Sequence, residues 1–552
     1  MSGTLRLDRN EGPPPSPALL EALAGIDPEA LRRYREVSGL EAALADRFDV
    51  QPDRVIVTAG ADEAIDRACR AFLGRGRTIL LPEPTFEMLD HFAALAGGRP
   101  TRVPWPAGPF PIDGFLARLD AHPALIAVVS PNNPTGAVAC ADDVRRLAAA
   151  APEALVLLDH AYVEYADADL TAAVADLANV LVIRTLSKAW GLAGCRVGYA
   201  IGSPTVVAAL RAAGGPYTVA APSVALALTQ ISLGETAVRD HVARVREERR
   251  SLGERLAALG VEPLPSQANF VYVECGPPPR APFVAAALRA LGILVRDFPG
   301  RAGCETALRI TLPGGEAKFE RLVHALETAL APEALLLDLD GVLADVRDSQ
   351  RAAIAATAAA FGVTVTSAEV AQTVREGDAA NDWAVTRRLI EGRGARASLE
   401  DVTTRYQALY LGRPGARGLR EHERLVPSRA LLERLAARLP LAIVTGRPRD
   451  EARWFLERAG IADLFRTVVA MEDAAPKPDP APVRLALERL GARRAWLVGD
   501  TPDDARAAAA AAVLPLAVVA PGDDRAATSA ALAQAGAARV LDDLTALLEV
   551  LP

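Results

Sequence analysis

Short apolar runs alternate with amphipathic stretches along the first 330 residues. The runs with the length and composition of buried strands are 55–58, 125–129, 154–158 and 180–184. Residues 62–73 and 142–151 place apolar side chains three or four positions apart, which predicts helices after two of these strands. Because such alternation is typical of a parallel sheet flanked by helices, we predict an α/β fold.

A second series of strand-like runs starts further along the chain, at residues 334–337, 441–444 and 496–498. Pro332 ends the helix that begins near Glu316, just before this second series. We therefore predict two α/β domains with almost no linker, residues 1–332 and 333–552.

The strand signal lapses between Asp345 and about Val426. Helical stretches replace it at residues 349–361, 367–375 and 383–391. Their position after the first strand of the new sheet predicts a helical cap, about residues 346–426, although a plain helical segment is the alternative. Residues 377–383 fit either a substrate loop or a surface turn.

Charge and composition exclude several classes of protein. The 552 residues include 69 acidic and 61 basic side chains, and this net charge of −8 disfavours a nucleic-acid-binding protein. No apolar run reaches the roughly 20 residues of a membrane-spanning helix, and the first ten residues lack the apolar core of a signal peptide. The cysteines form no Cys-x-x-Cys pair, which fits reduced, buried thiols. We expect a cytoplasmic protein that binds neither nucleic acid nor membrane.

Lysine is almost absent, since 58 of the 61 basic residues are arginine. The three lysines are Lys188, Lys318 and Lys477. An imine requires a primary amine, and a compact ammonium is not a planar guanidinium, so arginine cannot replace lysine in every role. Lys188 and Lys477 are therefore candidates for chemistry. Lys318 fits an ordinary surface residue.

A lysine and a set of anion-binding groups follow the strand at 180–184. Lys188 stands where a lysine can meet a cofactor aldehyde, and Thr185, Ser187 and Arg196 can together bind one phosphate ester. Gly60, Ala61 and Asp62 open a helix directly after a strand and offer backbone N–H groups to an anion.

Three further residues suit an aromatic nitrogen cofactor. Asp159 ends an apolar strand, where its carboxylate can keep a pyridine nitrogen protonated. A helix-capping aspartate is the alternative. Tyr162 and Asn133 could hydrogen-bond a ring hydroxyl, although the run Ser130–Gly136 is also typical of a tight turn.

Together these motifs closely resemble the fold-type I pyridoxal phosphate aminotransferases, and within them the histidinol-phosphate aminotransferase family. The resemblance covers about residues 4–330. The matching motifs, in the family's order, are GADEAI (60–65), SPNNPTG (130–136), DHAY (159–162), TLSKAWGLAGCRVGY (185–199) and LRIT (308–311). It implies a large domain with a parallel-type sheet and a small α/β domain.

The resemblance also implies roles around pyridoxal 5′-phosphate. Lys188 would hold the cofactor as an imine and shuttle a proton, and Asp159 would pair with the pyridinium. Asn133 and Tyr162 would hold the ring oxygen, and Phe86 would stack on the ring. The remaining cofactor-binding residues would be Gly60, Ala61, Asp62, Thr185, Ser187 and Arg196.

Substrate and partner contacts follow from the same resemblance. Arg309 would bind the carboxylate of the amino donor, Arg296 the phosphate of the acceptor, and Asn10 the substrate. Tyr34 would reach the cofactor phosphate of a partner subunit, which implies a homodimer.

Two departures from the family pattern affect the substrate. The run that opens with Asn10 lacks the tyrosine that the family usually carries there, and His160 replaces an acidic residue. Transamination does not depend on either. We expect His160 to face away from the ring as a strand-end neighbour rather than to act as a new acid or base.

The second domain carries paired carboxylates directly after its first strand. Asp338 and Asp340 stand at alternate positions, so one can attack phosphorus while the other handles protons. Lys477 can offset the charge of the nucleophile, and Thr445 can donate to a phosphate oxygen. Asp500 and Asp504 follow another strand and suit Mg²⁺.

This set resembles the haloacid dehalogenase superfamily, phosphatase branch, over residues 334–552. The resemblance implies a Rossmann-like domain in which Asp338 is the nucleophile and Asp340 the general acid and base. Thr445 and Lys477 would stabilise the phosphoryl oxygens. Asp338, the backbone carbonyl of Asp340, Asp500 and Asp504 would hold Mg²⁺, Asp504 as a ligand or as an orienting neighbour. Arg447 could touch substrate or cap the next helix.

The two halves suggest consecutive steps of histidine biosynthesis. Transamination of imidazole acetol phosphate with glutamate would give histidinol phosphate, which the second half would hydrolyse to histidinol. One alternative is an aminotransferase or decarboxylase with a phosphatase for another small phosphorylated amino or keto compound of secondary metabolism. A second is that one half is a silent regulatory module.

Overall fold

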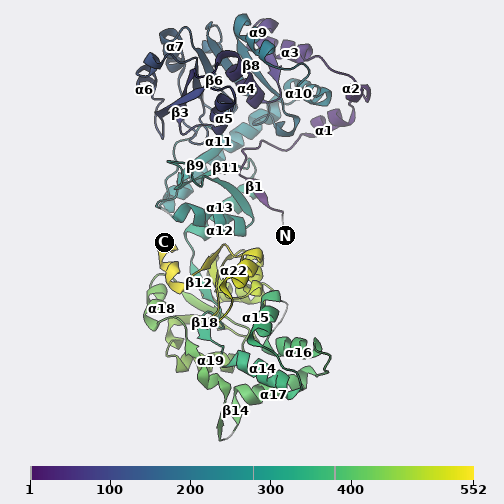
Figure 1. Ribbon diagram of the computed structural model, residues 1–552, viewed down its shortest axis with the longest axis vertical. Coiled ribbons are helices and arrows are strands. Elements are labelled where there is room, and N and C mark those ends of the chain that lie inside the picture. The colour runs from purple at the N-terminus through teal and green to yellow at the C-terminus, as the bar shows by residue number, and fades with distance from the viewer. Residues whose placement is uncertain (1–2, 278, 378–380, 414, 552) are drawn as a thin grey trace. The chain divides into compact units, whose positions relative to one another are not determined.

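The computed structural model describes residues 3–277, 279–377, 381–413 and 415–551 (Figure 1). Its contacts divide the chain into two compact units. The N-terminal unit comprises Arg6–Ala281 and Val295–Arg321, and the C-terminal unit comprises Met1–Leu5, Pro282–Leu294 and Leu322–Pro552. In the described residues, no helix is long and apolar enough to cross a membrane.

The N-terminal unit is built on a seven-stranded sheet in the order β2-β8-β7-β6-β5-β3-β4. All strands are parallel except β8, which runs antiparallel to both of its neighbours. The strands are β2 (Val55–Thr58), β3 (Thr78–Glu83), β4 (Arg99–Pro104), β5 (Leu125–Val129), β6 (Leu155–Asp159), β7 (Val180–Thr185) and β8 (Gly198–Gly202). The predicted strands and their parallel arrangement are confirmed.

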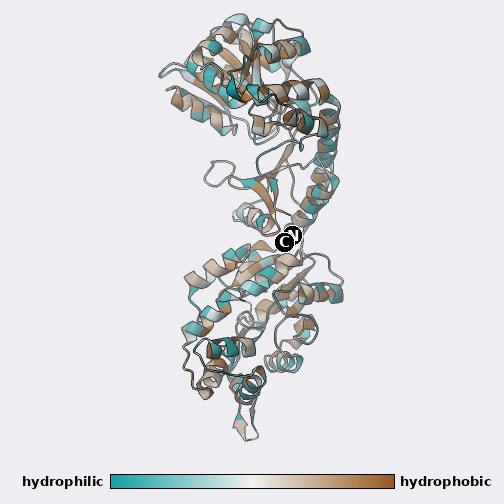
Figure 2. Cartoon of the chain, turned by 90° about the vertical axis from the view of Figure 1, so that its right-hand side faces the viewer, coloured by the Kyte–Doolittle hydropathy of each residue, from teal (hydrophilic) through white to brown (hydrophobic). Residues whose placement is uncertain are grey.

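Helices cover both faces of this sheet, so its central strands are apolar along most of their length, with polar residues such as Asp159 and Thr185 at their carboxyl ends. On β6, Leu157 packs into one core and Leu158 into the other. Apolar residues accordingly lie along the strands (Figure 2). The helices of this unit are α1 (Pro17–Ala24), α2 (Glu29–Arg32), α3 (Ser38–Phe48), α4 (Ala61–Phe72), α5 (Glu87–Leu95), α6 (Ile112–Leu116), α7 (Ala141–Ala150), α8 (Thr171–Val174), α9 (Pro204–Ala213), α10 (Ala221–Leu233) and α11 (Glu235–Ala258).

A smaller antiparallel sheet positions two arginines. It contains β9 (Phe270–Glu274), β10 (Ile293–Asp297) and β11 (Ala307–Thr311), with β11 paired to both others; β1 (Leu5–Leu7) adds to β10 at one edge. Arg296 stands directly opposite Arg309 across β10 and β11. Opposite residues of an antiparallel pair share a face, so both guanidinium groups lie on the same side.

The C-terminal unit has a six-stranded parallel sheet in the order β18-β17-β12-β19-β20-β21. Its strands are β12 (Ala334–Leu337), β17 (Leu441–Val444), β18 (Phe465–Val469), β19 (Ala495–Gly499), β20 (Leu514–Val518) and β21 (Arg539–Leu541). The accompanying helices are α12 (Arg280–Ala290), α13 (Glu316–Leu330), α18 (Arg429–Ala436), α19 (Arg449–Arg458), α20 (Ala481–Leu490), α21 (Pro502–Ala510), α22 (Arg525–Gln534) and α23 (Leu547–Val550). The central strand β12 lies between β17 and β19, which brings the ends of these three strands together.

Between β12 and β17 the chain forms four helices that share an apolar core, called the cap below. They are α14 (Gln350–Ala360), α15 (Ser367–Glu376), α16 (Asp382–Glu391) and α17 (Leu399–Tyr410). Two short strands, β13 (Ala344–Asp345) and β16 (Arg424–Leu425), pair where the chain enters and leaves the cap. A hairpin, β14 (Gly412–Arg413) with β15 (Ala416–Arg417), follows α17.

The cysteines are free, as expected, but they are not all buried. Cys140 is exposed at the start of α7, and Cys195 is half-buried. The prediction of five buried thiols was therefore wrong at these two positions.

Two candidate active sites

One cavity of the N-terminal unit lies where β5, β6 and β7 end. It brings together residues that the sequence motifs had singled out: Ala61, Asp62, Phe86, Asn133, Asp159, Tyr162, Thr185, Ser187, Lys188 and Arg196. Gly60 immediately precedes them as the N-cap of α4. The carboxyl ends of parallel strands meet at one edge of a sheet, which explains how residues so distant in sequence converge.

Hydroxyl groups, a guanidinium and a helix N-terminus form one end of this cavity. Thr185 Oγ1 donates to Ser187 Oγ at 2.8 Å, and Arg196 Nη2 lies 3.1 Å from Asp62 Oδ2. Gly60 has a φ of +82°, and a Cβ there would lie 2.5 Å from Arg196 Nη2. Only glycine therefore lets the guanidinium pass the start of α4. This end suits a phosphate ester.

The opposite end of the cavity holds a buried carboxylate. Asp159 ends β6 and accepts a hydrogen bond from the Ala161 amide at 3.0 Å. Burial raises its pKa to about 6, with Asp62 adding to the effect and the Ala161 amide and Lys188 opposing it. Binding a pyridinium would compensate for this desolvation, so the donor set fits pyridoxal phosphate.

Lys188 lies between this cavity and a second one. Its Nζ donates to the Arg9 carbonyl at 3.3 Å and lies 5.5 Å from the centre of the Tyr162 ring. The two cavities share Phe86, Asn133, Tyr162 and Lys188. Asn10 is buried in the wall of the second cavity and donates to Tyr162 Oη at 2.9 Å.

Four arginines, Arg9, Arg296, Arg301 and Arg309, line the second cavity. Arg309 donates to Asn133 Oδ1 at 2.6 Å and to the Asp8 carbonyl at 2.7 Å. Arg296 Nη2 lies 3.4 Å from both carboxylate oxygens of Glu87. Arg301, which was not predicted, donates to the Thr85 carbonyl from the loop after β10. The cavity thus suits a substrate with two separate anionic groups.

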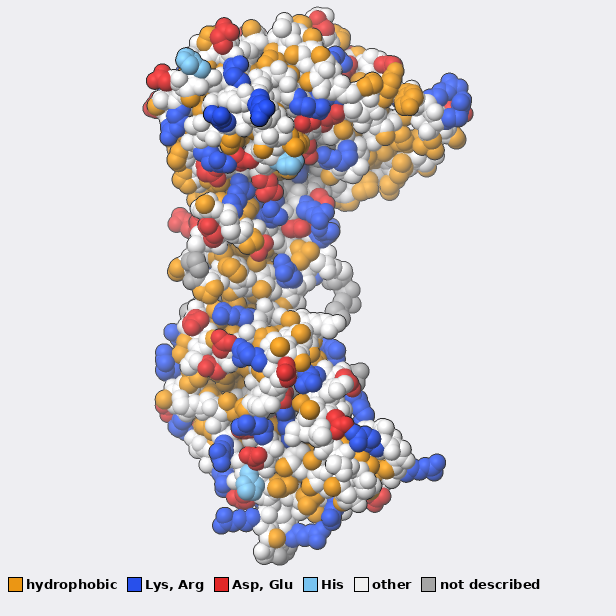
Figure 3. Space-filling view, viewed as in Figure 1, with side chains coloured by type: hydrophobic (Ala, Val, Ile, Leu, Met, Phe, Trp, Pro, Cys, Tyr) orange, Lys and Arg blue, Asp and Glu red, His pale blue; other side chains and the backbone are white. Residues whose placement is uncertain are grey.

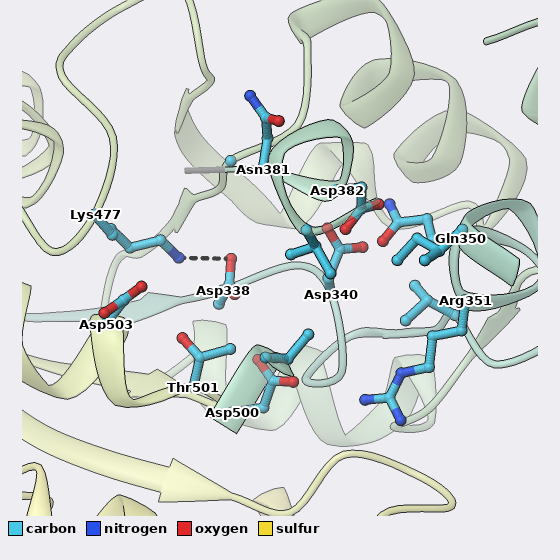
Figure 4. A pocket seen from close by; sticks show the side chains of 15 residues that line it. Asp338, Asp340, Gln350, Arg351, Asn381, Asp382, Lys477, Asp500, Thr501 and Asp503 are labelled. Atoms are coloured by element: carbon cyan, nitrogen blue, oxygen red, sulfur yellow. Dashed lines mark ion pairs between the residues drawn. The ribbon is translucent and has the colours of Figure 1, made fainter. Parts of the chain in front are cut away.

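In the C-terminal unit, Asp338 directly follows β12 and meets Lys477 (Figure 4). Lys477 Nζ lies 3.0 Å from Asp338 Oδ1, contacts Asp504 Oδ1, and donates to the Val444 carbonyl at 3.1 Å. Burial raises the pKa of Asp338 to about 7, and the Lys477 ammonium opposes that shift. A lysine so placed lowers the repulsion between a carboxylate and a phosphate.

Three buried carboxylates suit a divalent cation here. Oxygens of Asp338, Asp500 and Asp504 lie within 4.8 Å of one another. Within the described ranges, Asp500 Oδ1 is buried without a hydrogen-bond partner. Burial raises the pKa of Asp500 well above its ordinary value, and Asp338 and Asp504 reinforce the shift. Gly341, at a φ of +71°, leaves room for this group, because a Cβ there would lie 2.1 Å from Asp500 Oδ2. The oxygen set fits Mg²⁺.

Asp340 is held by an arginine. Arg447 Nε donates to Asp340 Oδ1 at 2.7 Å, and Nη1 reaches Glu423 Oε2 at 2.9 Å and Tyr410 Oη at 3.1 Å. Arg447 is 2 % exposed, and the N-cap of the following helix is Pro448. Of the two roles considered for Arg447, capping is therefore excluded, and its guanidinium orients Asp340 instead.

Thr445 directly follows β17, the neighbour of β12 in the sheet. Thr445 is buried after β17 and its hydroxyl accepts the Arg447 amide at 3.2 Å, while Gly446 lines the cavity. Cap residues also line it, among them Gln350, which no motif had singled out, and Asn381 and Asp382 from the segment 377–383. Of the predicted loop at 377–383, residues 378–380 lie outside the described residues.

The comparisons with known proteins agree with both sites. Residues 2–326, more than half of the chain, match the aminotransferase class I and II family. The chain belongs to this family. Residues 332–512 match the haloacid dehalogenase-like hydrolases. The protein is thus an enzyme that joins a pyridoxal phosphate-dependent aminotransferase to a phosphatase of the haloacid dehalogenase type.

Relatives resemble the aminotransferase half over most of their length. A histidinol-phosphate aminotransferase of Cereibacter sphaeroides is 36% identical over 340 residues, 59% of this chain and 91% of the relative. One of Paracoccus denitrificans is 34% identical over 60% of this chain and 91% of the relative. The crystal structure of the Sinorhizobium meliloti enzyme with pyridoxal-5′-phosphate matches with a TM-score of 0.54 and 27% identity, covering 58% of this chain and 89% of that one.

Two residues that the sequence analysis considered, His160 and Tyr34, line neither cavity of the aminotransferase half. His160 is buried and lies 3.8 Å from Asp169; burial and Arg184 lower its pKa to about 3, so the imidazole is neutral. It does not line the cofactor cavity. Tyr34 is 85 % exposed and stacks on Tyr217 with ring centres 4.9 Å apart.

Large apolar side chains are exposed on α1, α2, α10 and the loop before α10, and side chains of this kind gather over that part of the surface (Figure 3). They are Leu20, Leu23, Leu31, Tyr217 and Leu233. An exposed apolar patch of this kind is typical of a protein–protein interface.

Proposed function

We propose that the enzyme catalyses two consecutive steps, transamination of imidazole acetol phosphate with glutamate and hydrolysis of the resulting histidinol phosphate to histidinol. The observation that carries the proposal is the arginine-lined cavity beside Lys188, which has a place for a carboxylate and a separate place for a phosphate. The names of the relatives support the same substrate. A phosphatase in the same chain would consume the product.

In the aminotransferase half, the residues would bind, orient and transfer a proton. Bound pyridoxal phosphate supplies an aldehyde and an electron-withdrawing ring. Arg309 would bind the donor carboxylate, with Asn10 lining the same cavity, and Arg296 would bind the acceptor phosphate. Lys188 would carry a proton between the substrate carbon and the cofactor.

The cofactor itself would be held at three points. Gly60, Ala61, Asp62, Thr185, Ser187 and Arg196 would fix its phosphate, Asp159 its ring nitrogen, and Asn133 and Tyr162 its ring oxygen. Phe86 would cover one face of the ring.

In the phosphatase half, Asp338 would attack phosphorus while Asp340 donates a proton to the leaving oxygen. Asp340 would then take a proton from the water that hydrolyses the phosphoaspartate. Lys477 and Thr445 would stabilise the phosphoryl oxygens. Asp338, the Asp340 carbonyl, Asp500 and Asp504 would hold Mg²⁺, which supplies positive charge.

We further propose a cytoplasmic homodimer formed through the apolar patch around Tyr34, with Tyr34 reaching the partner's cofactor. We place the border between the two catalytic domains at residues 332 and 333.

The decisive experiment incubates the full chain with histidinol phosphate and 2-oxoglutarate and follows phosphate and glutamate separately. Both should appear. Absence of turnover at both sites would refute the histidine pathway and favour another phosphorylated amino or keto compound, to which the missing tyrosine after Asn10 points. A decarboxylase would instead release CO₂ from a phosphorylated amino acid, without forming glutamate.

A further inference from the structure

A second cavity of the phosphatase half adjoins the one that contains Asp338. The two share Asp340, Gln350, Asn381, Asp382 and Gly446. Figure 4 shows Asp382 and Gln350 beside Asp340, on the side away from Lys477. Because the general acid must reach the leaving oxygen, the space beyond Asp340 receives the alcohol part of the ester.

Two carboxylates from different elements face this space. Asp382, the first residue of α16, accepts from Tyr406 Oη at 2.7 Å. Glu451, on α19, accepts from Gln407 Nε2 at 2.9 Å. Among the described residues neither carboxylate forms an ion pair, and Glu451 is buried.

The basic group in the cavity wall is already engaged. Arg447 forms ion pairs with Asp340 and Glu423 but not with Asp382 or Glu451, and it lowers the pKa of these two carboxyls without contacting them. Burial raises the pKa of Glu451 to about 7 and that of Asp382 to about 6, with Asp340 adding to both shifts. At pH 8 both carboxyl groups are therefore charged, and among the described residues no basic side chain forms an ion pair with either of them.

Independent evidence places a ligand at the adjoining end of the same space. Asp500 is at least nine-tenths buried, and its Oδ1 has no hydrogen-bond partner in the described ranges, while the equally buried Asp338 contacts the Lys477 ammonium through its Oδ1. We expect the divalent cation and the phosphoryl group to bind at these carboxylates. The adjoining cavity would then hold the alcohol part of the phosphate ester.

We propose that the cap cavity binds a protonated amine of the leaving alcohol, with Asp382 and Glu451 as its counter-ions and Trp383 as an aromatic wall. The substrate class is therefore the phosphate monoester of an amino alcohol. This inference rests on the proposed phosphatase function and specifies its substrate. A neutral alcohol would leave both carboxylates desolvated and unpaired, whereas an ammonium group satisfies them.

The test compares 3-aminopropyl phosphate with propyl phosphate, using the full chain with Mg²⁺ at pH 8. We expect kcat/KM to be at least about tenfold higher for the amino ester, mainly through a lower KM. Asp382→Asn, Glu451→Gln and the double variant should bring this ratio towards one. Glu400→Gln, which alters an exposed acid on α17, is the matched control and should keep the ratio.

Binding provides a second measurement that does not depend on turnover. Isothermal titration of Asp338→Asn with each ester should show tighter binding of the amino ester, and adding Asp382→Asn should remove the difference. Equal binding of both esters, or binding of neither, overturns the inference.

The outcomes also separate this inference from the proposed pathway. A preference for amino esters without hydrolysis of histidinol phosphate supports the ammonium site and rejects the pathway. Hydrolysis of histidinol phosphate at a rate that Asp382→Asn and Glu451→Gln leave unchanged overturns the ammonium site and keeps the pathway.

Discussion

At the scale of single residues, lysine marks the sites because this chain uses arginine almost everywhere else. Lys188 and Lys477 both lie in the cavities, and Lys318 is exposed on α13. These positions agree with the expectation that Lys188 and Lys477 lie in sites and that Lys318 is a surface residue.

Replacing Lys188 by alanine tests its chemical role. Transamination should fall by more than about 1,000-fold because the primary amine that carries the proton is gone. The visible absorbance of the purified protein should disappear, while phosphate release persists. Lys318→Ala is the control and should keep both. An unchanged absorbance band in Lys188→Ala would mean that the amine is elsewhere.

Glu451 makes stability depend on pH in a predictable direction. Its native pKa of about 7 exceeds its ordinary value of 4.5, so the native state holds this proton more tightly than the unfolded state. Stability from this group is present below about pH 4.5 and is lost as pH rises through about 7. As the pH rises from 5 to 8, the free energy of unfolding of Glu451→Gln should therefore increase by about 1–3 kcal/mol relative to that of the unaltered protein.

Denaturant unfolding at both pH values measures this gain. Glu400→Gln should follow the unaltered protein at both. If the relative stability of Glu451→Gln were the same at pH 5 and pH 8, the carboxylate would titrate normally.

The motifs predicted most residues of both cavities, because catalysis fixes their type and spacing. They did not reveal Arg301, Glu423 or Glu451, and they left Asp382 in a segment that also fitted a surface turn. A buried acid has no signature in sequence when its partners come from distant elements. The role of Arg447 likewise became clear only from the fold, which brings Asp340 and Glu423 to it.

At the scale of elements, one hydrogen-bonded cluster joins the cap to the catalytic face. Glu423 precedes β16, Tyr410 ends α17, and both contact Arg447 from the loop after β17. Ser349, before α14, donates to Glu423 Oε1 at 3.1 Å. The base of the cap is therefore connected to the residue that orients Asp340.

Arg447→Met should separate the structural and catalytic effects of this cluster. Stability should fall by about 3–5 kcal/mol, because Glu423 stays buried without its counter-ion. Phosphatase kcat should fall by about 10- to 100-fold, because Asp340 loses its orientation. Thermal unfolding and phosphate release measure the two effects.

A second substitution controls for simple destabilisation. Arg447→Met with Glu423→Gln removes the unpaired charge and should recover much of the stability but not the activity. Recovery of both would show that Arg447 acts only through stability.

Periodicity predicted seven core strands and three cap helices within one or two residues, since burial on both faces of a parallel sheet makes strands largely apolar. The buried strands β3 and β20 and the cap helix α17 were not predicted. The antiparallel direction of β8 could not be predicted either, because the alternation of strands and helices along the chain does not indicate the direction of a strand.

At the scale of the whole chain, the helix before residue 332 packs against the phosphatase sheet. Trp496 on β19 is fully buried; its indole donates to the Thr328 carbonyl at 2.7 Å, and its ring lies 5.4 Å from Phe283. Arg494 contacts both Glu327 and Glu333. Residues of α12 and α13 thus complete the core of the C-terminal unit.

A fragment that starts at residue 333 should be unstable for this reason. It exposes Trp496 and leaves its indole N–H without the Thr328 acceptor, at a cost of about 2–4 kcal/mol. A fragment that starts at residue 316 keeps α13 and should be more soluble, with a higher unfolding midpoint. Equal behaviour of the two fragments would show that the contact adds no stability.

Independent chemistry in the two halves is a separate prediction. Asp338→Asn should abolish phosphate release, because the amide cannot attack phosphorus, and should leave transamination within about twofold. Glutamate and phosphate assays on one preparation measure both. Loss of both activities would show that the sites are coupled.

The exposure of Lys318 has a practical consequence. Apart from the α-amine at the start of the chain, it is the exposed amine among the three lysines, since Lys477 is buried against carboxylates and Lys188 lies inside a cavity. An amine-reactive fluorophore or a solid support would therefore attach at one internal point on α13, and would leave both catalytic centres free to work.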